Sequence, residues 1–157
     1  MKISRREFFV KSVQGAAIIS LPALISPILE SCTNPTSPQN ANPLASIQGT
    51  NSNGKIVLTI DSSSPLANTG TAASVHYQSG SILVDHPSNN VFNALSSICT
   101  HQACTIDSFD SGKEQFVCPC HGSRFDVNGN VVQGPAGLPL PKYTTQIEGD
   151  QLTINVG

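Results

Sequence analysis

The 157-residue sequence has little charge, few aromatic side chains and no tryptophan. Charged residues make up 11% of the chain and aromatic residues 5%. Coiled coils, charge-rich disordered regulators and nucleic-acid-binding proteins with a basic face all need more charge than this. Hydrophobic residues account for 38%, which is enough for one modest core. The length therefore fits one domain with additional segments.

Positive charge is especially scarce outside the N-terminus. Half of the eight basic residues lie within the first eleven positions, namely Lys2, Arg5, Arg6 and Lys11. From residue 32 onward, the acidic residues outnumber the basic ones. The body of the protein is therefore mildly acidic, and a patch of positive charge is expected only at the start of the chain.

Residues 1–31 have the features of a targeting segment rather than of a folded domain. The Arg5–Arg6 pair, followed by the uncharged and moderately apolar residues 12–29, resembles the twin-arginine export signal. This route carries folded proteins, often already loaded with a cofactor, across the membrane. The alternative is a basic pair before an uncleaved membrane helix. Such a helix would reach about 27 Å, barely a membrane span, and Pro22 and Pro27 would weaken it.

The fifth cysteine, Cys32, lies directly behind this segment. Residues 29–32 (Leu-Glu-Ser-Cys) resemble the lipobox of bacterial lipoproteins, although Glu30 replaces the usual small or apolar residue. Residues 32–45 are polar and proline-rich, as is typical of a flexible tether. We expect a lipid at Cys32 that holds the protein on the outer face of the cytoplasmic membrane. Cleavage elsewhere without a lipid, or retention of residues 12–29 as the anchor, are the alternatives.

The remainder, residues 46–157, is predicted to be all-β. Short β-rich runs alternate with Gly, Asn, Asp and Pro, and no helical periodicity extends beyond one or two turns. Asn128–Gly129 and Gly149–Asp150 each predict a hairpin. This pattern favours an antiparallel sandwich or a small barrel. The expected strands cover residues 56–60, 81–84, 91–95, 115–117, 124–127, 131–132, 143–147 and 151–156.

Two clusters of cysteine and histidine carry the chemical signal. The first reads Cys-Thr-His-Gln-Ala-Cys over residues 99–104, and the second reads Cys-Pro-Cys-His over residues 118–121. A C-x-H and a C-x2-H pair supply two thiolates and two imidazoles, a donor set that suits zinc or an iron–sulfur cluster. A zinc ribbon explains neither the two additional cysteines nor the proline-rich segment 134–141.

Over roughly residues 46–157 the sequence resembles the Rieske iron–sulfur proteins, through the signature C-x-H-x16-C-x2-H with its companion cysteines. The resemblance implies one [2Fe–2S] cluster per chain, with one iron on Cys99 and Cys118 and the other on His101 and His121. It implies a fold of stacked antiparallel sheets with a small cluster-binding subdomain at about residues 97–141. In an exported protein, two left-over cysteines on neighbouring loops indicate a disulfide. Cys104 and Cys120 match the disulfide positions of the family.

The resemblance also implies how the redox chemistry is tuned. Two neutral imidazole ligands raise the reduction potential into the Rieske range of about −150 to +300 mV, and their second nitrogens link electron uptake to proton uptake. Ser123 matches a serine that donates to a bridging sulfide. Phe125 occupies the position of a tyrosine that donates to a ligand sulfur, and Gln102 replaces the leucine of quinol-oxidising members. We therefore expect a potential above that of disulfide-free ferredoxins and below the highest values of the family.

The other polar residues of the body carry no recognisable motif. His76 and His86 are expected to be solvent-exposed and without a role, and Arg124 is expected to be a surface cation. Residues 107–110 are expected to form a solvated loop.

The sequence thus predicts an exported, membrane-tethered protein that transfers one electron at a time. It predicts cluster ligands but no catalytic residue. The leading hypothesis is the iron–sulfur subunit of a quinol-oxidising complex of the quinol–cytochrome c reductase kind, with cytochrome b or c partners and a quinol donor. An electron-transfer subunit of an exported molybdenum oxidoreductase is the alternative. A dioxygenase-type ferredoxin fits less well, because such ferredoxins stay in the cytosol and lack the disulfide. A structural zinc module fits less well, because it does not explain the two additional cysteines and the proline-rich segment.

Overall fold

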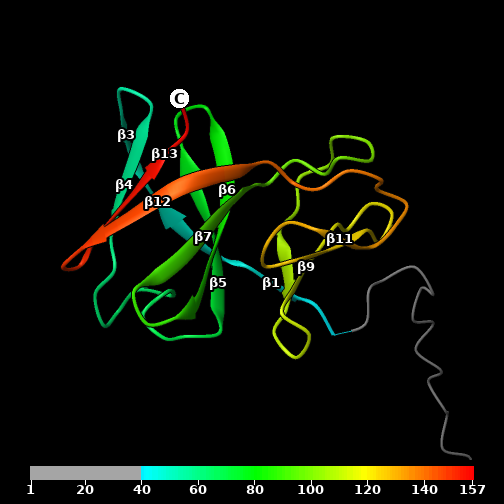
Figure 1. The fold of residues 1–157 in the computed structure, drawn as a ribbon, viewed down its shortest axis with the longest axis horizontal. Coiled ribbons are helices and arrows are strands. Elements are labelled where there is room, and N and C mark those ends of the chain that lie inside the picture. Colours follow the sequence, from blue (N-terminus) through cyan, green and yellow to red (C-terminus); the bar gives the residue numbers. More distant parts are fainter. Residues whose placement is uncertain (1–39) are drawn as a thin grey trace, which may run out of the picture. The chain divides into compact units, whose positions relative to one another are not determined.

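The computed structural model describes residues 40–157. The predicted export segment, Cys32 and most of the predicted tether lie outside these residues. Within the described range the chain forms thirteen strands, and no helix has the length and apolar character needed to cross a membrane. The strands are β1 (Asn42–Pro43), β2 (Ala45–Gln48), β3 (Thr50–Ser52), β4 (Lys55–Thr59), β5 (Thr71–Tyr77), β6 (Gly80–Ser88), β7 (Val91–Ser96), β8 (Ser108–Asp110), β9 (Gln115–Val117), β10 (Arg124–Asp126), β11 (Val131–Gln133), β12 (Lys142–Glu148) and β13 (Gln151–Asn155) (Figure 1).

These strands form two sheets. The large sheet has eight strands in the order β2-β5-β6-β7-β12-β13-β4-β3, and the small sheet has five in the order β1-β8-β9-β10-β11. The prediction of an all-β fold with stacked sheets is confirmed. One pair departs from the expected antiparallel arrangement, because β2 runs parallel to β5. The chain reaches β2 from β1 on the small sheet, and not through a hairpin with β5.

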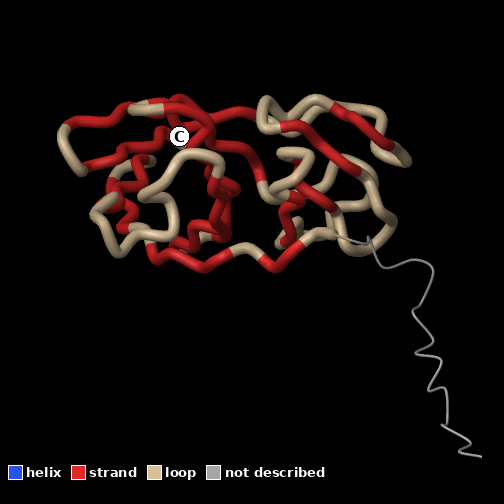
Figure 2. Tube along the Cα trace, turned by 90° about the horizontal axis from the view of Figure 1, so that it is seen from below, coloured by secondary structure: helices blue, strands red, loops and turns tan. Residues whose placement is uncertain are grey.

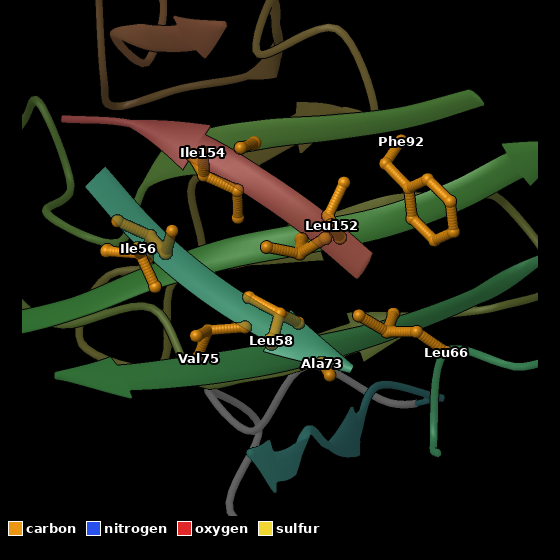
Figure 3. Packing of buried hydrophobic residues seen from close by; sticks show 11 residues of the cluster. Ile56, Leu58, Leu66, Ala73, Val75, Phe92, Leu152 and Ile154 are labelled. Carbon is orange, nitrogen blue, oxygen red and sulfur yellow. The ribbon is translucent and has the colours of Figure 1, made fainter. Parts of the chain in front are cut away.

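The core of the large sheet follows from the alternation of apolar residues along its strands. In β4 and β13 every second side chain is buried, and the register places Ile56 opposite Ile154 and Leu58 opposite Leu152. Figure 3 shows these side chains converging with Val75 on one apolar cluster. The two predicted hairpins are also present, as β10–β11 and β12–β13.

We define the small subdomain as residues 97–141, which include β8–β11. A second core lies between this subdomain and the large sheet. Leu83 of β6 and Leu95 of β7 point away from the first core and pack with Phe116 and Phe125 of the small sheet. Most residues of the segments that form the large sheet lie in strands, whereas loops make up most of the small subdomain (Figure 2). The free cysteines Cys99 and Cys118 belong to this second core.

The folded domain begins earlier than predicted. Asn42 and Pro43 of β1 pair with β8, and the Leu44 N–H donates to the carbonyl oxygen of Asp107 at 2.7 Å. The next residues form β2 on the large sheet. The end of the predicted tether is therefore part of the fold, and it connects the edge of the small sheet to the edge of the large one.

Candidate metal centre

The two cysteine–histidine loops of the small subdomain have the same backbone hydrogen bonds. In the first, the Cys99 N–H donates to the Cys104 carbonyl at 2.8 Å and the Ala103 N–H donates to the Cys99 carbonyl at 3.0 Å. In the second, the Cys118 N–H donates to the Ser123 carbonyl at 2.9 Å and the Gly122 N–H donates to the Cys118 carbonyl at 3.0 Å. Each loop therefore curls around its first cysteine and holds that side chain in a fixed place.

This curl needs one residue in the left-handed region of each loop. Gly122 has φ of 74° and Ala103 has φ of 54°. Glycine takes this conformation without steric cost, whereas alanine carries a penalty of about 1 kcal/mol or more. The second loop thus has the residue that its geometry favours, and the first loop keeps the same geometry with a less suitable residue.

A disulfide between Cys104 and Cys120 joins the two loops, with the Cα atoms 6.5 Å apart. The sulfur of Cys118 lies within 4.8 Å of both disulfide sulfurs. Sulfurs that are bonded to each other offer no thiolate, so they do not make this trio a metal site. Among the described residues, the thiols available for a metal are those of Cys99 and Cys118, and both are buried.

The surroundings of Cys118 favour the protonated thiol until a cation binds. Burial raises the pKa of Cys118, and the adjacent Cys99 thiol raises it further, while backbone hydrogen bonds from Cys120 and His121 act in the opposite direction. Two thiolates held together in an apolar core repel each other. A metal that replaces their protons removes this repulsion.

The two histidines of the motif lie next to each other. The ring centroids of His101 and His121 are 4.8 Å apart, and the ring planes are nearly perpendicular at 85°. His121 is exposed and His101 is half-buried. The Nδ1 atom of His101 is buried and has no hydrogen-bond partner among the described residues. Buried polar atoms rarely lack a partner, and a metal on this nitrogen accounts for it. Two buried thiols and two adjacent imidazoles therefore fit a two-iron cluster.

The proline-rich segment 134–141 is fastened to both loops. The Thr100 Oγ1 donates to the carbonyl oxygen of Leu138 at 2.6 Å, and the Ala136 N–H donates to the Oγ of Ser123 at 3.0 Å. Ser123 is fully buried, and its hydroxyl proton is not used in that bond. The sequence motifs did not identify Thr100, because its hydrogen bond is to Leu138, which is 38 positions further along the chain.

The remaining residues that the sequence singled out near the site differ in burial. Phe125 is fully buried in the second core, in the same cluster as Cys99 and Cys118, and its ring offers no hydrogen-bond donor. Gln102 is exposed within the first loop, directly after His101.

The expectations for three other polar residues were wrong. Arg124 is buried and donates to Asp110 at 2.9 Å, and Asp110 lies in β8 rather than in a solvated loop. His86 is buried as well, stacks on Phe92 with 4.2 Å between ring centroids, and contacts the carbonyl oxygen of Leu66 through Nδ1 at 2.9 Å. His76 is exposed, as expected.

The two loops that carry the histidines and the proline-rich segment have no formally charged side chains. Residues 99–106, 118–123 and 134–141 contain no Asp, Glu, Lys or Arg. Leu138, at the tip of the proline-rich segment, is 67% exposed. We call these three segments together the uncharged tip.

Comparison with known proteins agrees with this geometry. The profile of the Rieske [2Fe-2S] domain matches residues 57–144, which is more than half of the chain. The cytochrome b6-f complex iron-sulfur subunit of Prochlorococcus marinus (strain AS9601) is 48% identical over 60 residues, covering 38% of this chain and 33% of the relative. The corresponding subunit of Chlorobaculum thiosulfatiphilum is 40% identical over 62 residues, covering 40% and 34%. The chain thus spans about a third of the length of these curated relatives.

Solved structures show the same fold. The cyanobacterial plasma membrane Rieske protein PetC3 from Synechocystis PCC 6803 is 28% identical, with a TM-score of 0.52 over 62% of this chain and 98% of that one. The ferredoxin of carbazole 1,9a-dioxygenase from Nocardioides aromaticivorans IC177 shares the fold at 21% identity, with a TM-score of 0.51 over 64% and 98%. The matched domain, the fold and the donor set agree: the chain belongs to the Rieske [2Fe–2S] family, and its cofactor is a [2Fe–2S] cluster.

Proposed function

We propose that this protein is the exported, membrane-tethered Rieske subunit of a quinol-oxidising cytochrome complex. The observation that carries the proposal is the exposed His121 within the uncharged tip. A quinol in a membrane-embedded partner is an uncharged, largely apolar molecule. An exposed imidazole surrounded by uncharged loops and the exposed Leu138 suits an approach to such a donor.

In this proposal the thiolates of Cys99 and Cys118 bind one iron, and the imidazoles of His101 and His121 bind the other. The bound cluster supplies a site that takes up and releases one electron. His121 accepts a hydrogen bond from the quinol hydroxyl on the exposed side of its ring and then holds the proton. Ser123 keeps the proline-rich segment in place through Ala136, and its hydroxyl proton is left available for a further acceptor. Burial of both cysteines keeps water away from the ligand sulfurs.

The relatives support a cytochrome partner. Those described above are subunits of the cytochrome b6-f complex, and their similarity to this chain covers about a third of their length. The partners of this chain are therefore proposed to be a cytochrome b that presents the quinol and a c-type cytochrome that receives the electron.

Several features favour export and a membrane tether. The Arg5–Arg6 segment suits the twin-arginine route, which accepts folded, cofactor-loaded proteins. A disulfide such as Cys104–Cys120 persists in an oxidising compartment. In this proposal the lipid is on Cys32, and the tether consists of residues 32–41, because β1 begins at Asn42. PetC3 is itself described as a plasma membrane protein.

A second candidate is an electron-transfer subunit of an exported molybdenum oxidoreductase. Phe125 and Gln102 favour it, because the former cannot donate a hydrogen bond to a ligand sulfur and the latter is polar where quinol-oxidising members have leucine. Both departures suit a partner that works at a lower potential.

Purification of the affinity-tagged full-length chain from membranes of its native host tests the proposal. We expect a haem-b protein and quinol–cytochrome c reductase activity to co-purify, and the activity to disappear in His121→Ala. His76→Ala is the matched control, since His76 is an exposed histidine on the large sheet. Co-purification of a molybdenum protein without haem b would favour the second candidate and contradict the first.

A further inference from the structure

Asp85 is a buried acid in the contact between the large sheet and the small subdomain. It lies on β6, between β5 and β7, and only 2% of its surface is exposed. Side chains alternate along β6, so Val84 belongs to the first core and Leu83 to the second. Asp85 points to the same side as Leu83, where Phe109 and Val127 of the small subdomain share a small cavity with it.

The carboxyl group of Asp85 has too few hydrogen-bond donors for an ionised group. Its Oδ2 accepts one bond from the Nδ2 of Asn93 at 3.0 Å. Its Oδ1 is buried and has no partner within residues 40–157. The adjoining cavity has a volume of about 10 Å³, which is room for about one water molecule. A carboxylate can accept several hydrogen bonds, and burying it with one donor is costly, whereas the protonated acid is far less costly to bury.

The charged groups around Asp85 do not compensate for this shortage. Burial raises the pKa of Asp85 to about 7, and the hydrogen bond from Asn93 acts against this rise. Glu114, in the β8–β9 turn, and Asp126, on β10, raise the pKa further, while Lys142, at the start of β12, lowers it. His86 also lines the cavity, but its Nδ1 contacts the carbonyl oxygen of Leu66.

We propose that Asp85 is a proton-operated latch between the large sheet and the small subdomain. With the carboxyl neutral, the small sheet packs closely on β6 and β7. When the carboxyl ionises, the negative charge draws water and donors into the contact and loosens it. Leu83 and Leu95 contribute to the same second core as Cys99 and Cys118, so the latch acts on the packing beneath the metal centre. This response to pH is separate from that of the histidines, and it does not depend on which partner supplies the electron.

The sign of the effect follows from the two states of the carboxyl. In the unfolded chain it ionises near its ordinary pKa of 3.8, and in the folded protein at about 7. The folded state therefore holds a proton that the unfolded state has already lost. The stabilisation from the neutral acid is complete below the unfolded pKa and is lost as the pH rises through the folded value.

The test uses the cluster-loaded protein, from about pH 5 to about pH 9. The measurements are the thermal midpoint and the amide hydrogen exchange of β8 and β9, corrected for intrinsic rates. We expect both the midpoint and the protection of the wild type to fall as the pH rises to neutrality. In Asp85→Asn this fall is absent, whereas the exposed turn variant Asp150→Asn follows the wild type. A fall of the same size in Asp85→Asn overturns the proposal.

Two further variants test the latch even where Asp85→Asn does not assemble. Glu114→Gln removes a neighbouring negative charge, so the transition moves to lower pH. Lys142→Met removes the neighbouring positive charge, so the transition moves to higher pH. Transitions that stay in place in both variants contradict the proposal.

Discussion

In the large sheet, every second side chain of β4 and β13 is buried, and the nine-residue strand β6 is buried on both faces. Burial of these side chains explains why the strands pair as they do. In the small subdomain the strands β8–β11 have three residues each. A disulfide, a buried ion pair and side-chain bonds to the backbone hold its loops in place instead. The large sheet thus provides general stability. The small subdomain depends on a few specific contacts, and each of them can be removed separately.

The largest expected effect separates the two regions. His121→Ala removes an exposed residue that we propose as a ligand, so we expect complete loss of the visible cluster absorption, while the circular dichroism of the sheets persists. Leu152→Ala, in the core of the large sheet, should cost about 2–5 kcal/mol of unfolding free energy, with the cluster absorption retained below the transition. Absorption spectra and denaturant unfolding of both variants measure this. Retention of the cluster in His121→Ala would mean that His121 is not a ligand.

The buried ion pair of the small subdomain comes next. Arg124→Ala leaves the Asp110 carboxylate buried without its partner, and we expect a loss of about 3–5 kcal/mol in urea unfolding. The double variant Arg124→Met with Asp110→Leu is the control, because it removes both charges and should recover most of the loss. Equal stability of Arg124→Ala and the wild type would contradict the assigned burial.

The disulfide is expected to contribute somewhat less. Cys104 and Cys120 are 16 residues apart, and closing a loop of this size stabilises the folded state by about 3 kcal/mol. In Cys104→Ser with Cys120→Ser we expect a loss of this order in urea unfolding, and a cluster that is released more readily. Peptide mapping without reductant that finds both thiols free in the wild type would contradict the pairing.

The two loops allow a matched pair of smaller changes. Gly122→Ala places a Cβ at φ of 74°, with open space around it, so the backbone penalty alone should cost about 1 kcal/mol. Ala103→Gly removes the corresponding strain at φ of 54° and should be neutral or stabilising. Thermal unfolding compares the two variants. A stabilising Gly122→Ala would contradict the left-handed conformation of this residue.

The smallest expected effect concerns the reduction potential. Phe125→Tyr adds a hydroxyl in the second core, and if this group reaches the Cys99 sulfur it stabilises the reduced cluster. One hydrogen bond to a charged acceptor contributes about 1.5–3 kcal/mol at most, and only its difference between the two redox states shifts the potential. We expect a rise of a few tens of millivolts in voltammetry, at ~23 kcal/mol per volt. An unchanged or lower potential would mean that the tyrosine position lies elsewhere.

The same contrast explains which parts of the fold could be predicted from the sequence. The alternation in β4 and β13 and the turn residues of the two hairpins are local signals, and these elements were predicted. The strand β5 was missed because its sequence, Thr-Ala-Ala-Ser-Val-His-Tyr, is poor in large apolar residues; it forms because it lies between β2 and β6. The short strands β1, β2, β3 and β8 carry no period long enough to recognise.

The candidate site also has features that the sequence predicted and features that it did not. The spacing of cysteine and histidine identified the candidate ligands, because the chemistry requires those residue types within two short loops. Arg124 pairs with a residue 14 positions away, and His86 is buried by Phe92 of the neighbouring strand and by a contact with the Leu66 carbonyl 20 positions away. No local sequence pattern marks these contacts, so the sequence did not predict them. The role of Asp85 depends in the same way on the small subdomain that covers it.

Two cysteines and two histidines of the small subdomain are proposed to bind one [2Fe–2S] cluster. Electron paramagnetic resonance of the reduced protein tests this most directly, together with iron and sulfide analysis. We expect a Rieske-type signal, with an average g below that of all-cysteine clusters and about two irons and two sulfides per chain. A colourless protein with one zinc, or a signal typical of four cysteine ligands, would contradict this ligand assignment.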